Sequence, residues 1–161
     1  MSDQPASDND PAFHLAQVNI ARARFPIDDP GMADFMSRLD EINALADQAP
    51  GFVWRLQDDS GNATNFQPYD DPRILINLSV WKSVDALHDF VYKTAHAEVM
   101  RRRDDWFEKP HAPHMALWWT PADEHPATLD GTSRLLHLGQ FGPTASAFTF
   151  KRRFPPPTAR I

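Results

Sequence analysis

The chain has 161 residues, of which 42% are hydrophobic and 24% are charged, a balance typical of one globular domain and unlike that of a disordered chain. Its net charge of -6 disfavours nucleic acid as a partner, because such a surface repels phosphates. The absence of cysteine excludes disulfides and thiolate metal sites, and no apolar run reaches the roughly 20 residues that a membrane-spanning helix needs. We therefore expect a soluble cytoplasmic protein that does not associate with membranes.

Two tails flank one predicted domain. Residues 1–11 are mostly small, acidic or proline residues with little to bury, and they predict a disordered tail. Residues 155–161 begin with three prolines, which cannot donate ladder hydrogen bonds, and they predict an extended arm. The domain between the tails spans residues 12–154.

Two periodicities divide this domain into elements. Alternation with a period of two indicates strands, whereas apolar residues three and four positions apart indicate helices. Asp29 and Ser83 precede helical patterns as side-chain caps. In chain order the predicted elements are a strand at 13–21, a helix from Asp29 to about 47, strands at 52–57 and 73–81, a helix after Ser83, a helix at 95–107, a strand at 114–120, a helix after Pro126 and a strand at 147–152.

This order predicts an α+β fold. Its first six elements match a ferredoxin-like βαββαβ antiparallel sheet, in which the helices lie on one face and bury their apolar stripes against it. The last helix and the last strand are then additions at the C-terminus.

The third strand has two different faces, one purely apolar and the other polar and aromatic. If the apolar face meets the helices, Asn77, Ser79 and Trp81 face away from them. The first and third strands are central neighbours in this topology, and we expect Gln17 and Asn19 to lie beside Asn77 and Ser79.

An uncovered face of this kind predicts a homodimer. Monomers seldom expose a large half-apolar patch, and a second sheet could cover the one around Trp81. The two sheets would then enclose a chamber with amides at its centre. In the alternative interpretation, the amides only satisfy one another in a structural interface.

Four segments, LAQVNIAR at 15–22, GFVWR at 51–55, RRRDDWF at 101–107 and WWTP at 118–121, carry a resemblance to known proteins. Through them the chain resembles the dimeric α/β-barrel superfamily that includes the antibiotic biosynthesis monooxygenases. More narrowly, it is similar to an uncharacterised family of that superfamily, defined only as a domain of unknown function. The resemblance implies a dimeric α/β barrel, and the narrow family has no assigned chemistry to transfer.

A broader comparison is with haem-degrading monooxygenases of the superfamily. They use an asparagine on the first strand, and a tryptophan and an axial histidine on the helix after the third strand. By position, the resemblance matches Asn19 to the asparagine and His96 to the histidine. Phe90 stands where the tryptophan would be, and this departure argues against haem degradation, while haem binding stays an alternative.

The resulting hypothesis is a monooxygenase-like enzyme, either cofactor-independent or haem-linked, that acts on a small aromatic or planar hydrophobic substrate in a pocket between the helix layer and the barrel sheets. The catalytic candidates are Asn19, Asn77 and His96. The substrate-binding candidates are Gln17, Ser79, Trp81, Phe90 and Trp54. The competing hypothesis is a non-catalytic homodimer that binds a small ligand such as haem, or a purely structural dimer.

Other polar residues have simpler interpretations. His96 could act as a base or ligand, or it could be an inert residue in a first helical turn. The run at 101–103 covers nearly a full helical turn and predicts a solvated face, with the alternative that one arginine reaches an anionic ligand. His111 and His114 lack a third zinc ligand, and we expect no metal site.

Overall fold

The computed structural model describes residues 12–59, 61–64 and 66–158, and the tail predicted at 1–11 lies outside them. Its four strands are β1 Phe13–Arg22, β2 Phe52–Arg55, β3 Ile74–Trp81 and β4 Met115–Pro121. Its helices are the 3-10 turn η1 Pro30–Met32, α1 Ala33–Gln48, α2 Val84–Lys93, α3 Ala95–Arg101, α4 Arg103–Trp106 and α5 Thr128–Phe141.

The strands form one antiparallel sheet in the order β2-β3-β1-β4. The central pair is β1 and β3, in a register that places Gln17 opposite Ser79 and Asn19 opposite Asn77. This confirms the predicted α+β class, its ferredoxin-like strand order and the meeting of the four polar residues. The amides lie together because they share both a strand pair and a parity.

Side-chain caps begin the helices where the sequence placed them. The Asp29 carboxylate accepts a hydrogen bond from the Gly31 N–H ahead of α1, and the Ser83 hydroxyl accepts one from the Ala86 N–H in α2. The helix predicted at 95–107 is instead two short helices, α3 and α4, which meet at Arg102.

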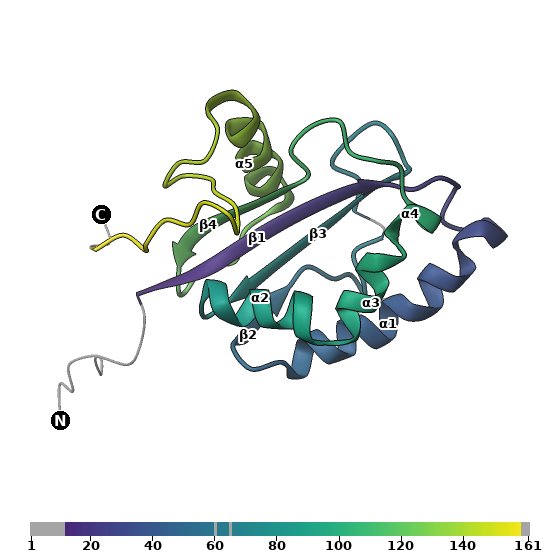
Figure 1. Cartoon of the computed structure of the whole chain (residues 1–161), viewed down its shortest axis with the longest axis horizontal. Helices are drawn as coiled ribbons and strands as arrows, with labels where there is room; N and C mark the ends of the chain where they lie inside the picture. Colours follow the sequence, from purple (N-terminus) through teal and green to yellow (C-terminus); the bar gives the residue numbers. More distant parts are fainter. Residues whose placement is uncertain (1–11, 60, 65, 159–161) are drawn as a thin grey trace.

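Helices cover both faces of the sheet, and the predicted assignment of the faces was wrong. The apolar face, which includes Val18, Leu78 and Val80, packs against α5. The face that carries the amides and Trp81 packs against α1 and α2. In Figure 1, α5 lies on one side of the sheet, and α1, α2 and α3 lie on the other.

A glycine explains why α5 takes the apolar face. A Cβ atom on Gly131 would lie 2.8 Å from Val18 Cγ2 and 2.9 Å from Leu78 Cδ2. The missing side chain therefore allows α5 to approach β1 and β3 closely. Since α5 lies on these strands and α1 and α2 cover the other face, the expected chamber between two facing sheets is also wrong.

The C-terminal segment runs along the outer edge of β4. Leu117 and Phe148 exchange two backbone hydrogen bonds, of 2.8 and 2.9 Å, and the Trp119 indole N–H donates to the Phe154 carbonyl at 2.9 Å. These contacts occupy part of an otherwise unpaired edge. The predicted strand at 147–152 is reduced to isolated bridges, and residues 155–158 of the predicted arm contain neither helix nor strand.

Within the described ranges, every helix is too short or too polar to cross a membrane. The expected cytoplasmic location stays a prediction.

Candidate functional site

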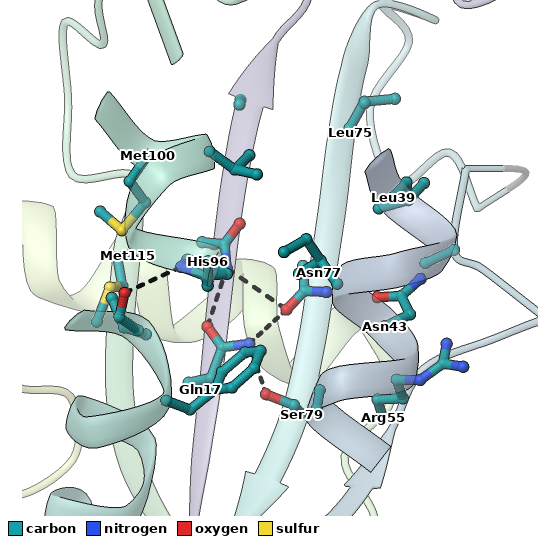
Figure 2. A pocket seen from close by; sticks show the side chains of 18 of the residues that line it. Gln17, Leu39, Asn43, Arg55, Leu75, Asn77, Ser79, His96, Met100 and Met115 are labelled. Carbon is teal, nitrogen blue, oxygen red and sulfur yellow. Dashed lines mark hydrogen bonds between the residues drawn. The ribbon is translucent and has the colours of Figure 1, made fainter. Parts of the chain in front are cut away.

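A cavity of about 260 Å³ lies between the amide-bearing face of the sheet and the helices that cover it. Strands β1 and β3 supply its polar wall, and α1 supplies Leu39 and Asn43 on the facing side (Figure 2). Met100 of α3 and Met115 of β4 line another side. The residues of this cavity come from a single chain, and the cavity does not require a second copy.

The polar wall is a hydrogen-bonded cluster of amides and one hydroxyl. The Gln17 amide donates to Asn77 Oδ1 at 2.5 Å and to Ser79 Oγ at 2.8 Å. The Asn19 amide donates to Gln17 Oε1 at 3.1 Å and to Asn77 Oδ1 at 3.4 Å. Each amide therefore holds its neighbours in one orientation, and the wall is preorganised rather than loose.

The cluster leaves one strong donor unused. Both bonds to Asn77 end on its oxygen, and its amide nitrogen has no acceptor among the described residues. Figure 2 shows that this nitrogen lies on the side of Asn77 that faces Asn43 of α1. A partly exposed donor that faces a cavity can bind an oxygen atom of a ligand.

Asn43 is a cavity residue that the sequence reasoning missed. It is only 9% exposed, and its side chain makes no hydrogen bond to another described residue. A buried amide of this kind needs a polar partner, which a ligand or water in the cavity would supply. The signal was available, because Asn43 interrupts the apolar stripe that Leu39, Ile42 and Ala46 form along α1.

Aromatic rings close one end of the cavity. Trp81 stacks on Phe90 of α2 with 5.2 Å between ring centroids, and Phe52 meets Trp81 edge-on at 5.4 Å. The Trp81 indole N–H donates to Ser79 Oγ at 2.8 Å, which ties the ring to the amide cluster. This end offers a flat apolar surface to a ligand.

His96 lies beside the aromatic end, in the first turn of α3. Its Nδ1 is 3.3 Å from the Val91 carbonyl, and its ring is 5.2 Å from that of Phe90. Burial lowers the pKa of His96, although the contact with the Val91 carbonyl opposes this shift. The imidazole is therefore neutral near pH 7, and a Nδ1–H donated to Val91 leaves Nε2 as an unprotonated base.

Arg55 of β2 fixes the cavity wall where α1 and β2 meet. It is 8% exposed, and its guanidinium donates to both oxygens of Asp47, at 2.7 and 3.2 Å. A third N–H donates to the Gly61 carbonyl at 2.7 Å. This arginine is engaged by the protein itself and has a structural role.

Residues 14–161 match a protein family described as a domain of unknown function, DUF3291. The chain belongs to this family. The narrow resemblance seen in the sequence is thereby confirmed. A search of curated proteins gives no match.

Solved structures also resemble this DUF3291 chain. A cofactor-independent oxygenase from Streptomyces nogalater is 17% identical, with 72% of this chain and 100% of that one covered and a TM-score of 0.49. A protein of unknown function from Nitrosomonas europaea is 15% identical, with 72% and 97% covered and a TM-score of 0.45. A second Nitrosomonas europaea protein, provisionally described as an antibiotic biosynthesis monooxygenase, is 17% identical, with 71% and 93% covered and a TM-score of 0.44.

In this DUF3291 chain, seven of the eight residues predicted for the site line the cavity. They are Gln17, Asn19, Asn77, Ser79, Trp81, Phe90 and His96. Trp54 is the exception, because it pairs with Val80 and therefore shares the parity of the opposite face. Its ring stacks on His125 at 4.7 Å.

Among the residues that the DUF3291 structure describes, no group of three or more histidines and carboxylates could hold a metal ion. His111 is not among the cavity residues, whereas His114 lines the cavity near the start of β4.

Proposed function

We propose that this chain is a monooxygenase-like enzyme that oxidises a small aromatic or planar hydrophobic substrate in the cavity, without a bound cofactor. One observation carries the proposal: a neutral, partly buried imidazole, His96, lines the same cavity as the unused amide donor of Asn77. A base and an oxygen-binding donor are the two groups that carbanion chemistry needs.

The shape of the cavity supports a compact flat substrate. Its volume of about 260 Å³ is slightly below the roughly 300–1,000 Å³ typical of ligand sites. The stacked pair of Trp81 and Phe90 gives a planar ring a surface to lie against. We infer a ligand of two or three fused rings rather than a larger molecule.

The inferred reaction begins at a CH₂ group that is acidic because the aromatic rings beside it conjugate the resulting carbanion with a carbonyl. His96 Nε2 removes one proton, and the Asn77 N–H donates to the oxygen that becomes negative. The substrate carbon then bonds to O₂, and the proton on His96 passes to the outer oxygen to give a hydroperoxide. Loss of water breaks the O–O bond and the second C–H bond, and the sum is CH₂ + O₂ → C=O + H₂O, with the substrate as the reductant.

An oxygen electrode tests this proposal with anthrone, a planar compound that contains such a CH₂ group. We expect oxygen uptake above the uncatalysed rate, and Asn77→Ala should lower kcat about 100-fold, the usual effect of losing one oxyanion donor. The matched control is Gln140→Ala, which removes an exposed amide on α5. Uptake no faster than in buffer, or an Asn77→Ala variant as active as the parent, would contradict the proposal.

The second candidate function is non-catalytic binding of a small ligand. The observation that favours it is that His96 contacts a backbone carbonyl and, within the described part of the chain, has no carboxylate partner to strengthen it as a base. Under this alternative, anthrone binds and quenches tryptophan fluorescence while oxygen uptake stays at the background rate.

Haem does not fit this cavity. A macrocycle with two propionates is larger than the ligands that occupy sites of this volume, and the ring of Phe90 lies against His96 on the side of Trp81. We expect the Soret band of haemin to change in the same way with the parent protein and with the His96→Ala variant. A Soret shift that depends on His96 would show that the cavity opens to admit an iron ligand.

We also propose a homodimer, with the outer side of α5 as its interface in place of the amide-bearing face of the sheet. The outer side of α5 exposes Leu129 and Leu136, at 73% and 65%, seven residues apart on one helical face. A second copy would bury this surface rather than the amide-bearing face of the sheet. Light scattering after size exclusion should give twice the chain mass, and Leu136→Glu should give a monomer.

A further inference from the structure

Cationic groups gather in the wall of the cavity. They are the guanidinium groups of Arg38, Arg55 and Arg103, which lie beside the uncharged imidazoles of His96 and His114. No aspartate or glutamate of the described part of the chain lines it. The cavity therefore has the opposite sign to the chain as a whole, whose net charge is -6.

Two of the three arginines are already paired. Arg55 Nε lies 2.7 Å from an oxygen of Asp47, and Arg38 Nε lies 3.4 Å from an oxygen of Asp34. Arg103, the first residue of α4, has no carboxylate within ion-pair distance among the residues that the structure describes. Its half-buried guanidinium is therefore the cation in the wall that lacks a protein counter-charge.

His114 approaches the same end of the cavity from the start of β4. Burial lowers the pKa of His114, and the nearby charge of Arg103 lowers it further. The His114 imidazole is therefore uncharged, and both it and the Arg103 guanidinium line the cavity. A carboxylate bound here would supply the counter-charge that Arg103 lacks and gain a bidentate contact from the arginine fork.

We propose that the substrate is an aromatic acid, and that Arg103 binds its carboxylate while the flat ring system extends toward Trp81. This inference rests on the proposed function, since it names the class of substrate for the same cavity. Arg103 acts here as a specificity-determining residue. The amides and His96 meet the part of the molecule that reacts.

Titration calorimetry with a pair of isosteric probes tests the inference. The probes are 2-naphthoate and 2-naphthamide, which share a ring system and differ in one negative charge. We expect naphthoate to bind at least about tenfold more tightly, the factor that one charge-assisted hydrogen bond provides. Arg103→Gln should abolish this preference, whereas Arg103→Lys should keep part of it because it retains the charge.

The matched control is Arg101→Gln, which removes an exposed arginine two residues away that does not line the cavity. It should keep the full preference, and circular dichroism should show that all three variants are folded. Equal affinity for the two probes, no naphthoate binding, or a preference that survives Arg103→Gln would overturn the inference. Anthrone is neutral, and its turnover by Arg103→Gln reports on the proposed function separately from the anion site.

Discussion

The two faces of the sheet are built from alternate residues of the same strands, yet they differ in packing and in polarity. Under α5 the face is apolar and filled, and Gly131 allows backbone and side chains to close on Val18 and Leu78. Under α1 and α2 the face carries amides and encloses a cavity. The filled face therefore supplies stability, while the cavity face can keep amide groups without a protein hydrogen-bond partner, so that a ligand can bind them.

Truncation of one leucine on each face gives the largest expected difference. Leu78→Ala removes a fully buried side chain beneath α5, and we expect the free energy of unfolding to fall by about 2–5 kcal/mol. Leu39→Ala, on the cavity wall, should cost less because Leu39 is already partly exposed there. Urea denaturation measures both, and equal losses would show that the two faces are packed alike.

Two glycines of α5 differ in the space around them, and substitutions there test how tightly the filled face is packed. Gly131→Ala places a methyl group within 3 Å of two core side chains, and the overpacking should cost about 1–3 kcal/mol. Gly139→Ala meets nothing closer than Pro113, at 3.8 Å, and should stabilise the helix by up to about 1 kcal/mol. Thermal unfolding of the pair checks this, and a stabilising Gly131→Ala would mean that α5 is packed loosely.

Partly buried imidazoles on both faces should make stability depend on pH. Burial is the largest cause that lowers the pKa of His96 and His114 in the cavity wall, and of His14 on the opposite face, below the usual 6.5. Below pH 6.5 the unfolded chain therefore binds more protons than the folded one, and stability is lost as the pH falls through that value.

The His96→Gln variant isolates one part of this response. It should make stability fall less steeply between about pH 6.5 and 5, because one of the three differences in proton uptake disappears. Urea denaturation at several pH values measures the slope. An unchanged slope would mean that His96 titrates normally in the folded protein.

The smallest expected effect is at a tryptophan on the opposite side of the sheet from the cavity. Trp54→Phe should leave anthrone turnover and naphthoate affinity unchanged, because Trp54 stacks on His125 away from the amides. Trp81→Phe should weaken binding several-fold, since it removes the indole N–H bond to Ser79. A clear loss of activity in Trp54→Phe would show that Trp54 contributes to the site.

Much of the site was predictable because strand parity is a local property. Gln17 and Asn19 share a parity, and the strand order places them opposite Ser79 and Asn77. The sequence did not distinguish Arg103 from Arg101 and Arg102, because three consecutive arginines point in different directions around a helical turn and the pattern does not show which one faces the cavity. Asn43 was missed although it interrupts the apolar stripe of α1, because the stripe does not show whether the helix packs over a filled core or over a cavity.

The sequence by itself determined the order of the elements, the helix caps, the central strand pair and the set of residues on each face, because these follow from periodicity and short-range chemistry. Only the tertiary structure decided which helices cover which face. Both faces carry enough apolar area to pack against a helix, and the choice depends on the close approach that Gly131 allows α5 and on the large rings of Trp81 and Phe90 beneath α2. The same packing places the amides inside one chain rather than between two.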